Sequence, residues 1–205
     1  MNATTASAPL IVVSGPSGVG KTTVVERLLT QMKDQLPPLR RAITATTRPP
    51  RPGEHDGRDY HFWSREQFEK AIAEQQMLEY AIVFGNDYYG TPKSEVEPYL
   101  AQGIGVILVI DVQGAARVRE LFPACLSIFI APPSLAELEA RLRGRNDTAE
   151  ERIARRLRTA HQEMAEAGKF QHQIVNRDLE QAVRELQQRI GDRFHCLGGS
   201  LCSKS

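Results

Sequence analysis

A glycine-rich stretch, GPSGVGKTT at residues 15–23, follows directly on the apolar run LIVVS and constrains this chain more than any other feature. Its spacing fits G-x-x-x-x-G-K-[ST], with Gly15, Gly20, Lys21 and Thr22 at the defining positions. Glycines let backbone N–H groups close around anionic oxygens, and the following helix presents its positive end to them. The pattern therefore predicts a strand, a phosphate-binding loop and a helix, rather than a merely flexible turn.

Each residue of this loop has a predicted place in the phosphate site. Lys21 is expected to reach the outer phosphates, and the Thr22 hydroxyl to ligate Mg²⁺. The predicted phosphate-binding residues are Gly15, Pro16, Ser17, Gly18, Val19, Gly20, Lys21, Thr22 and Thr23. The loop by itself leaves open whether the chain is a kinase, a hydrolase, a switch or an inert binding module.

The composition is that of an ordinary α/β domain. The 205 residues are 41% hydrophobic and 25% charged, with a formal net charge of +1, so no nucleic-acid or membrane partner is expected. Cys125, Cys196 and Cys202 form no metal or disulfide pattern, which favours a cytoplasmic location. The N-terminal segment does not resemble a signal peptide, and no segment is long enough to span a membrane.

Apolar runs and helix starts indicate the fold class. Buried strands are predicted at residues 10–13, 104–110, 125–131 and 173–176. Continuous apolar strands separated by helical patterns indicate a parallel sheet covered by helices. Capping boxes predict helix starts at Ser64–Gln67, Ser94–Glu97, Ser134–Glu137 and Thr148–Glu151.

Two segments differ from this parallel pattern. Residues 39–90 contain short strand-like pieces separated by turn residues, which predicts a small mixed or antiparallel sheet. Residues 134–165 are polar and helical, which predicts a helix–turn–helix flap. Because no repeat or low-complexity linker separates these parts, we expect one domain with two inserted mobile lobes.

The segment TTRPPRPGEHDGRDYHF narrows the chemistry further. Arg48 and Arg51 lie three residues apart in a proline-stiffened loop, and Tyr60 follows shortly after. Guanidinium groups bind phosphate bidentately, and a tyrosine hydroxyl adds a neutral donor. Taken alone, the loop is slightly better interpreted as a solvated basic segment. Beside a phosphate-binding loop it favours a second phosphate site, because phosphoryl transfer needs both a donor and an acceptor.

At this point the sequence resembles guanylate kinase, a family of P-loop nucleoside monophosphate kinases. The resemblance rests on SGPSGVGKTT, TTRPPRPGEHDGRDYHF, EYAIVFGNDYYGTP, VIDVQGAARV, IFIAPPSLAELEARLRGR and QIVNRDLEQA, in the family's order. It implies an α/β P-loop kinase with a central parallel sheet flanked by helices, a small mixed-sheet GMP-binding lobe and a helical lid.

The resemblance also implies a division of the chain. The kinase domain is expected over residues 9–191, with flexible tails at 1–8 and 192–205. Within it, the core is expected at 9–38, 92–133 and 168–191, the GMP-binding lobe at 39–91 and the lid at 134–167.

Further site residues follow from the resemblance, position by position. Glu79 matches the glutamate that reads guanine, and a carboxylate can accept from both N1–H and the N2 amino group, which adenine does not offer. The residues implied to bind GMP are Thr44, Arg48, Arg51, Tyr60, Glu79, Tyr89, Thr91 and Asp111. Of these, Arg48, Arg51 and the two tyrosines are expected on the phosphate and the threonines near guanine O6.

Asp111 directly follows the apolar run at residues 104–110 and fits the Walker B position, near Mg²⁺ or the acceptor base. Many relatives carry a second acid two residues earlier, where this chain has Val109. We therefore expect the cofactor Mg²⁺ to be held by Thr22, the phosphates and water, with less help from carboxylates.

Three arginines lie in the predicted flap. Arg141 and Arg145 are four residues apart and share a helix face if the helix runs that far, and Arg156 follows. A solvent-facing stripe is the commoner fate of such runs, but the resemblance implies a lid that places positive charge on the transferring phosphoryl group. Asn176 matches a position that contacts the ATP base region.

The implied activity is reversible Mg²⁺-dependent transfer of the γ-phosphoryl group of ATP to GMP or dGMP, giving ADP and GDP. The implied catalytic residues are Lys21, Arg48, Arg141, Arg145 and Arg156. Two other interpretations stay open: a non-catalytic guanylate-kinase-like binding module, and a kinase for AMP or a sugar phosphate. A GTPase switch is disfavoured because no N-K-x-D motif occurs, and the five histidines show no zinc or triad spacing. Oligomeric state stays undetermined.

Overall fold

The larger of two sheets is parallel. The computed structural model describes residues 8–33, 38–83, 87–143 and 150–197. Five strands lie in the order β2-β7-β1-β8-β9 and all pair in parallel. They are β1 (Leu10–Ser14), β2 (Leu39–Arg41), β7 (Gly105–Val109), β8 (Leu126–Ala131) and β9 (His172–Val175). The four apolar runs are thereby confirmed as strands of one parallel sheet.

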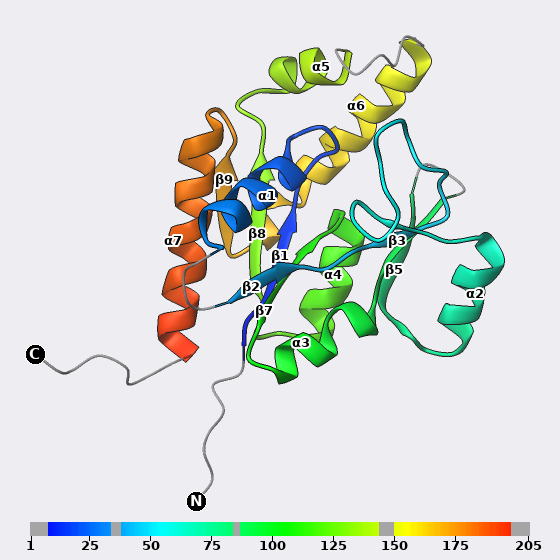
Figure 1. The fold of residues 1–205 in the computed structure, drawn as a ribbon. Helices are drawn as coiled ribbons and strands as arrows, with labels where there is room; N and C mark the ends of the chain where they lie inside the picture. The colour runs from blue at the N-terminus through cyan, green and yellow to red at the C-terminus, as the bar shows by residue number, and fades with distance from the viewer. Residues whose placement is uncertain (1–7, 34–37, 84–86, 144–149, 198–205) are drawn as a thin grey trace, which may run out of the picture.

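Helices cover both faces of this sheet (Figure 1). They include α1 (Lys21–Gln31), α3 (Glu97–Ala101), α4 (Val112–Leu121) and α7 (Leu179–Leu197). Successive side chains of β1 point to opposite faces, so Ile11 and Val13 pack in one apolar cluster with α1 and α7. Leu10 and Val12 pack in the other, with α3 and α4. Burial on both faces explains why these strands are apolar throughout.

The smaller sheet is mixed and forms the lobe seen at the right of Figure 1. Its strands lie in the order β4-β3-β6-β5, with β3 and β4 parallel and the other pairs antiparallel. They are β3 (Ala45–Thr46), β4 (His61–Phe62), β5 (Met77–Val83) and β6 (Asp87–Pro92). The helix α2 (Arg65–Ala73) packs on this sheet through Phe68 and Ala71, over a small apolar core of its own. The predicted mixed-sheet lobe is confirmed.

One predicted boundary of this lobe is wrong. Residues 39–41, placed in the lobe by the sequence, form β2, which pairs with β7 in the larger sheet. The run is only three residues long and contains Arg40 and Arg41, so it lacks the apolar pattern of its neighbours. Its membership in the larger sheet depends on hydrogen bonds to a strand more than sixty residues away.

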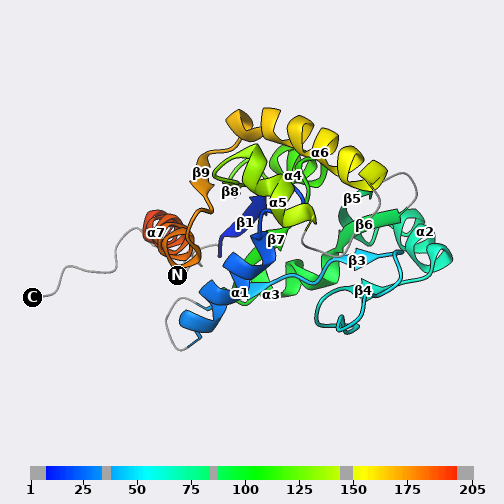
Figure 2. The same ribbon diagram turned by 90° about the horizontal axis from the view of Figure 1, so that it is seen from above.

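Two helices form the predicted flap, α5 (Leu135–Arg143) and α6 (Glu150–Ala165). Figure 2 shows α6 running along the upper edge of the view, between the side of β9 and the lobe. The carboxyl-terminal half of α6 packs on the body of the protein, since Ala160 is 1% exposed and Leu157 and Met164 contact the two apolar clusters. A short 3₁₀ helix, η2 (Ala167–Lys169), then leads to β9.

The capping boxes differ in outcome. Ser64 and Gln67 form a complete capping box at α2, and Ser134 accepts from the Glu137 amide at 3.1 Å. The prediction at Ser94 is wrong, because Ser94 lies in the 3₁₀ helix η1 (Lys93–Glu95) and Val96 precedes α3 instead. The prediction at Thr148 lies outside the described residues.

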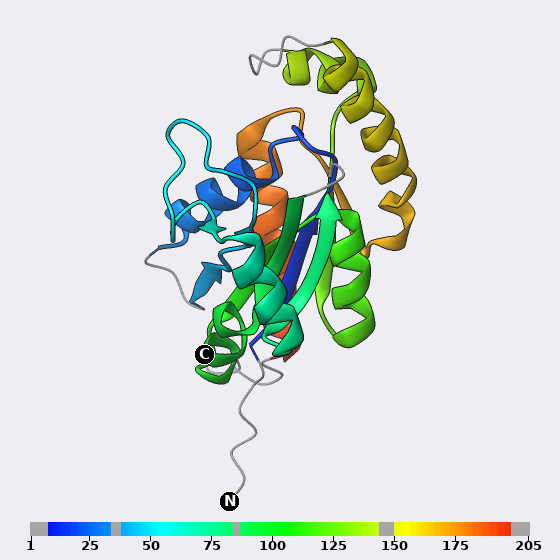
Figure 3. The ribbon, with the colours of Figure 1, turned by 90° about the vertical axis from the view of Figure 1, so that its right-hand side faces the viewer.

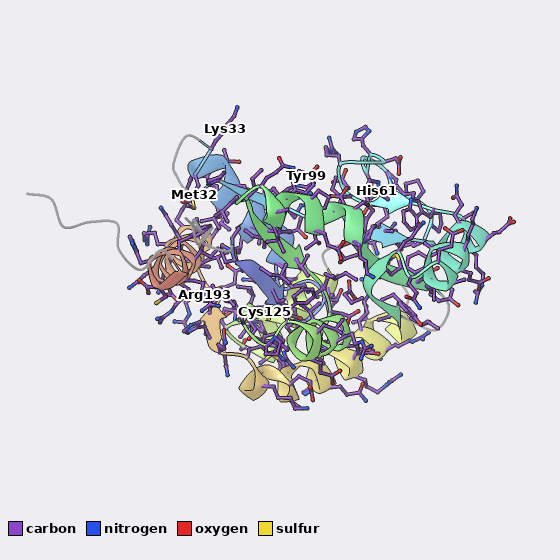
Figure 4. All side chains as sticks on the ribbon, turned by 90° about the horizontal axis from the view of Figure 1, so that it is seen from below. Met32, Lys33, His61, Tyr99, Cys125 and Arg193 are labelled. Atoms are coloured by element: carbon purple, nitrogen blue, oxygen red, sulfur yellow. The ribbon has the colours of Figure 1, made fainter. Side chains whose placement is uncertain are left out.

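The carboxyl-terminal boundary of the folded domain also differs from the prediction. Residues 192–197, predicted to begin a flexible tail, continue α7, and Phe194 packs against the apolar cluster beneath α1. Cys125 is buried, as expected of a small apolar side chain, and Figure 4 shows it near Arg193. Within the described ranges, no helix is both long and apolar enough to cross a membrane.

Candidate functional site

The phosphate loop joins β1 to α1 at the carboxyl edge of the larger sheet. Gly20 precedes α1 with φ of 96°, a conformation that favours glycine, and a Cβ there would lie 2.7 Å from the side-chain nitrogen Nδ2 of Asn176. At Gly15, with φ of 142°, a Cβ would lie 2.1 Å from the carbonyl oxygen of Ile130. The glycines are thus required by close packing as well as by the turn.

Lys21 is the first residue of α1, and its side chain folds back over the loop. Its Nζ donates to the carbonyl oxygens of Gly15 at 2.6 Å and Pro16 at 3.0 Å. The N-cap position is Gly20, which has no side chain to cap the first N–H groups of α1. A helix start of this kind, with a lysine above it, is suited to an anion.

A single cleft lies between this loop, the lobe and α6. From the loop it is lined by Ser17, Gly18, Gly20, Lys21, Thr22 and Thr23. From the lobe it is lined by Thr44, Arg48, Arg51, Tyr60, Glu79 and Tyr89. Asp111 and Arg156 complete the set of predicted residues that the structure brings together here. Figure 3 shows the loop before β4 (cyan) and α6 (yellow) rising on either side of the phosphate loop.

The lobe contributes a cationic and phenolic cluster. The Arg48 guanidinium donates to the Tyr89 hydroxyl at 3.1 Å and to the Glu54 carboxylate at 3.0 Å. Glu54 also accepts from the Arg51 amide at 2.7 Å, so one carboxylate orients both arginine positions. Burial raises the pKa of Tyr60, and the neighbouring Tyr89 adds to that rise, so the phenol stays a neutral donor. The structure thus brings the predicted residues of the second anion site together, and their role in binding phosphate stays a prediction.

Glu79 on β5 lies at the base of the cleft and is 4% exposed. Its Oε1 accepts from the Thr91 hydroxyl at 2.7 Å, while Thr44 lines the cleft nearby. Burial raises the pKa of Glu79 to about 7; the Asp111 charge adds to the rise and hydrogen bonds from Thr91 oppose it. A buried carboxylate with one oxygen oriented by a threonine suits recognition of paired N–H donors.

Asp111 lies two residues after the end of β7 and directly before α4. Its Oδ1 accepts from the amides of Gln113 at 2.7 Å and Gly114 at 2.9 Å, so the residue is an N-cap as well as part of the cleft. Val109 also lines the cleft, at the position where many relatives carry a second acid. In the described parts of the chain, no group of three or more His, Cys, Asp or Glu is arranged to hold a metal.

Arg141 and Asn176 contact the back of the phosphate loop instead of lining the cleft. The Asn176 side chain donates to the Val19 carbonyl at 2.7 Å. Arg141 donates to the same carbonyl at 3.4 Å and to the Asn176 carbonyl at 3.1 Å. In this structure Arg141 thus contacts loop carbonyls, and its contact with the transferring phosphoryl group stays a prediction. Arg145 lies outside the described residues.

Four further predicted residues lie behind the cleft surface. Gly15 and Pro16 contribute the carbonyls that hold Lys21, and Val19 is fully buried beneath the loop. Thr91 is also fully buried and reaches the cleft only through Glu79. These residues support groups that line the cleft.

Two acidic residues of the site were not predicted. Glu54 accepts hydrogen bonds from the Arg48 guanidinium and the Arg51 amide. In the sequence, its place within the basic loop is the only feature that points to this role. Glu163 on α6 lines the cleft and accepts from the Ser17 amide at 3.3 Å. No local pattern points to Glu163, because it lies 146 residues from its partner and reaches it only through the path of α6.

Comparisons with known proteins agree with this geometry. A family model described as guanylate kinase matches residues 7–193. The chain is 51% identical over 181 residues to the guanylate kinase of Gloeobacter violaceus, covering 88% of this chain and 86% of that protein. It is 47% identical over 189 residues to the guanylate kinase of a Synechocystis species, covering 92% and 96% respectively.

A solved structure shows the same fold. The crystal structure of guanylate kinase from Anaplasma phagocytophilum matches with a TM-score of 0.75 and 30% identity, over 91% of this chain and 86% of that one. The chain belongs to the guanylate kinase family, nucleoside monophosphate kinases that phosphorylate GMP at the expense of ATP.

Proposed function

We propose that the cleft positions two nucleotides for direct phosphoryl transfer, with ATP on the phosphate loop and GMP against the lobe. The observation that carries this proposal is that one cleft is lined by Lys21, which follows β1 of the larger sheet, and by Arg48 and Glu79 from the lobe of the smaller sheet. A donor site and an acceptor site facing each other allow in-line attack without a covalent intermediate on the enzyme.

The acceptor phosphate is bound by Arg48, Arg51, Tyr60 and Tyr89 in this proposal. Glu54 already holds Arg48 in place, so little side-chain freedom is lost when the phosphate binds. The phosphate oxygen of GMP then attacks the γ-phosphorus, while Lys21 and Arg156 stabilise the charge that spreads over the equatorial oxygens. Arg141, through Val19 and Asn176, acts by shaping the loop.

Guanine specificity is assigned to the ionised form of Glu79. Its carboxylate accepts from guanine N1–H and N2–H, and Thr91 keeps one oxygen oriented. Thr44 supplies a hydroxyl near O6. AMP lacks both the N1–H and the N2–H donor, and leaving a buried charge without partners is costly, so AMP should be a poor acceptor.

Mg²⁺ is the cofactor that this donor set fits. Its ligands here would be the Thr22 hydroxyl, nucleotide phosphates and water, and Asp111, which lines the same cleft, would accept hydrogen bonds from such water. Mg²⁺ in phosphoryl-transfer sites commonly keeps several waters and needs few protein ligands, so Val109 in place of an acid does not exclude it. Bound there, the ion would neutralise negative charge on the nucleotide phosphates. The cysteine pattern makes a cytoplasmic location our expectation.

An acceptor panel tests the proposal. GMP, dGMP, AMP and UMP are supplied separately with ATP and Mg²⁺, and ADP release is measured with a coupled assay. We expect turnover with GMP and dGMP and at least ~10³-fold lower kcat/KM with AMP and UMP. A preference for AMP would contradict the role of Glu79. No turnover with any acceptor would instead favour the non-catalytic binding module, which the intact phosphate loop argues against.

A further inference from the structure

Glu163 stands out among the residues that the proposed function does not use. It is a carboxylate inside a cleft otherwise suited to phosphate, on the helix α6, with its Oε2 3.3 Å from the Ser17 amide. Burial raises the pKa of Glu163, Lys21 and the Ser17 N–H oppose that rise, and Asp111 adds to it. A negative charge at this place repels incoming phosphates, so a role in binding anions does not explain why Glu163 lies in the cleft.

The contact joins two parts of the molecule that are distant in sequence. Ser17 belongs to the phosphate loop, and Glu163 lies in the last turns of α6. Around Glu163, α6 is held by the body of the protein, because Ala160 is 1% exposed and Met164 packs against the cluster beneath α4. Glu163 therefore lies on the packed half of α6.

Arg156 lies on the same helix, seven residues before Glu163. Seven residues are close to two full turns, so both side chains share one face of α6, about 10 Å apart along its axis. Both line the cleft. Fixing Glu163 against the loop therefore fixes the direction from which Arg156 approaches the phosphates.

From this geometry we infer that Glu163 is a positioning residue for phosphoryl transfer. Its hydrogen bond to the Ser17 amide sets the register of α6 on the phosphate loop, and that register places Arg156 over the transferring group. The inference rests on the proposed function, because it assigns Glu163 a purpose only if Arg156 acts on a phosphoryl group.

A double-mutant cycle tests this coupling in the full-length chain. E163A, R156A and the double variant are compared with the parent protein by kcat and by KM for each nucleotide. We expect E163A to lower kcat about 10- to 100-fold with KM for GMP within about twofold, because misplacing a catalytic group can cost this much. In the R156A background, adding E163A should lower kcat by less than about a further twofold.

Conservative variants separate positioning from simple stability. E163Q keeps an acceptor oxygen for the Ser17 N–H, so it should retain kcat within about threefold of the parent. E163D keeps the charge but withdraws the carboxylate from the loop, so it should behave like E163A, and it replaces E163A if that variant does not fold. Q162A, on the exposed side of the same turn, is the matched control and should leave kcat unchanged.

Three results would overturn the inference. Losses from E163A and R156A that multiply in the double variant would show that the two residues act independently. Unchanged kcat with tighter ATP binding in E163A would show that Glu163 only competes with phosphate. A loss in E163Q equal to that in E163A would show that the charge, not the hydrogen bond, matters. Failure of the proposed function is distinguishable, since the parent protein would then show no transfer to GMP.

Discussion

At the scale of single residues, the site depends on side chains whose partners are already in place. Glu54 holds Arg48, Thr91 holds Glu79, and two loop carbonyls hold Lys21. Each functional group thus has few other rotamers available before a nucleotide arrives, which lowers the entropy lost on binding. Substitutions at these positions should change kinetics more than folding.

The lysine of the phosphate loop gives the most direct test at this scale. Lys21→Ala should lower kcat by about 10³-fold, because a charge that stabilises the transition state is lost. Its free energy of unfolding, measured by denaturant titration, should stay within about 1 kcal/mol of the parent, since Lys21 is only partly buried. Lys33, labelled in Figure 4 and exposed after α1, provides the control Lys33→Ala. Near-normal kcat in Lys21→Ala would refute the assignment.

Glu79 should give GMP binding a pH dependence. The pKa of Glu79 is about 7, so the carboxylate is mostly protonated at pH 6 and mostly ionised at pH 8. Because only the ionised form accepts from both guanine donors, KM for GMP should rise about tenfold as the pH falls from 8 to 6. E79Q should show a much higher KM for GMP at pH 8.

The control for this prediction is a comparison of how KM for GMP depends on pH in the parent protein and in E79Q. The phosphate of GMP also titrates near neutral pH, but it does so equally with both proteins. Any pH dependence of KM for GMP that is present in the parent protein and absent in E79Q is therefore caused by titration of Glu79. Identical pH profiles for E79Q and the parent protein would contradict the assignment of the ionised carboxylate to guanine.

Gly114 on α4 faces the same carboxylate. A Cβ at Gly114 would lie 2.5 Å from Oε2 of Glu79, which is too close to be accommodated without moving that group. Gly114→Ala should therefore raise KM for GMP by about 10- to 100-fold while KM for ATP stays unchanged, in steady-state assays with either nucleotide varied. Gly191→Ala in α7 is the matched control, because a Cβ there meets nothing within 4 Å. An equal rise in both KM values would indicate general disruption.

At the scale of elements, local hydrogen bonds decide where helices begin. Ser64 and Gln67 satisfy free amides at the start of α2, the helix that packs on the mixed sheet. Ser94 fits the same sequence pattern but caps no helix. The difference is set by η1, which occupies the turn before α3.

This contrast predicts different costs for the two serines. Ser64→Ala should lower the free energy of unfolding by about 1 kcal/mol, because the N-cap hydrogen bond is lost. Ser94→Ala, at an exposed position, should change it by less than about 0.5 kcal/mol. Denaturant titration of both variants measures the two values. Equal losses would contradict the capping role observed at α2.

At the scale of the whole molecule, one carboxylate joins the lobe to the body. Glu95 in η1 pairs with Arg40 of β2 at 2.7 Å and accepts from the Ile43 amide at 3.1 Å. It also lies 3.1 Å from Nε2 of His61 in β4, and Arg40 stacks on Tyr99 of α3. Figure 4 labels His61 and Tyr99, which flank this junction. Glu95 therefore contacts both sheets at the place where the chain passes between them.

Removing this carboxylate should loosen the junction. Glu95→Ala leaves the partly buried Arg40 and the Ile43 amide without this partner, so the free energy of unfolding should fall by about 2 kcal/mol. KM for GMP should rise, because the lobe that binds GMP is less well oriented. Chemical denaturation and steady-state kinetics measure the two effects, with the exposed Glu97→Ala as control. Unchanged stability would contradict a role for Glu95 in holding the lobe.

The strands of the larger sheet and the phosphate loop were predictable because their causes are local. A run buried on both faces must be apolar, and a loop that closes around phosphate needs glycine at fixed spacing. The strand β2 was not predictable, because its three residues owe their position to β7. The same holds for Asn176 and Arg141, whose contacts with the Val19 carbonyl depend on how β9 and α5 pack.

The sequence by itself determined the phosphate loop and the basic and phenolic loop, because both depend on residue types at short spacing that local sterics and hydrogen bonding favour. The assignment of Glu79 to guanine came only from the resemblance to guanylate kinases. Tertiary structure decided which groups meet. It places Glu163 beside the Ser17 amide and Glu54 beside Arg48 and the Arg51 amide. It also places Arg141 against the Asn176 carbonyl. Those contacts depend on the packing of elements far apart along the chain, which no short pattern encodes.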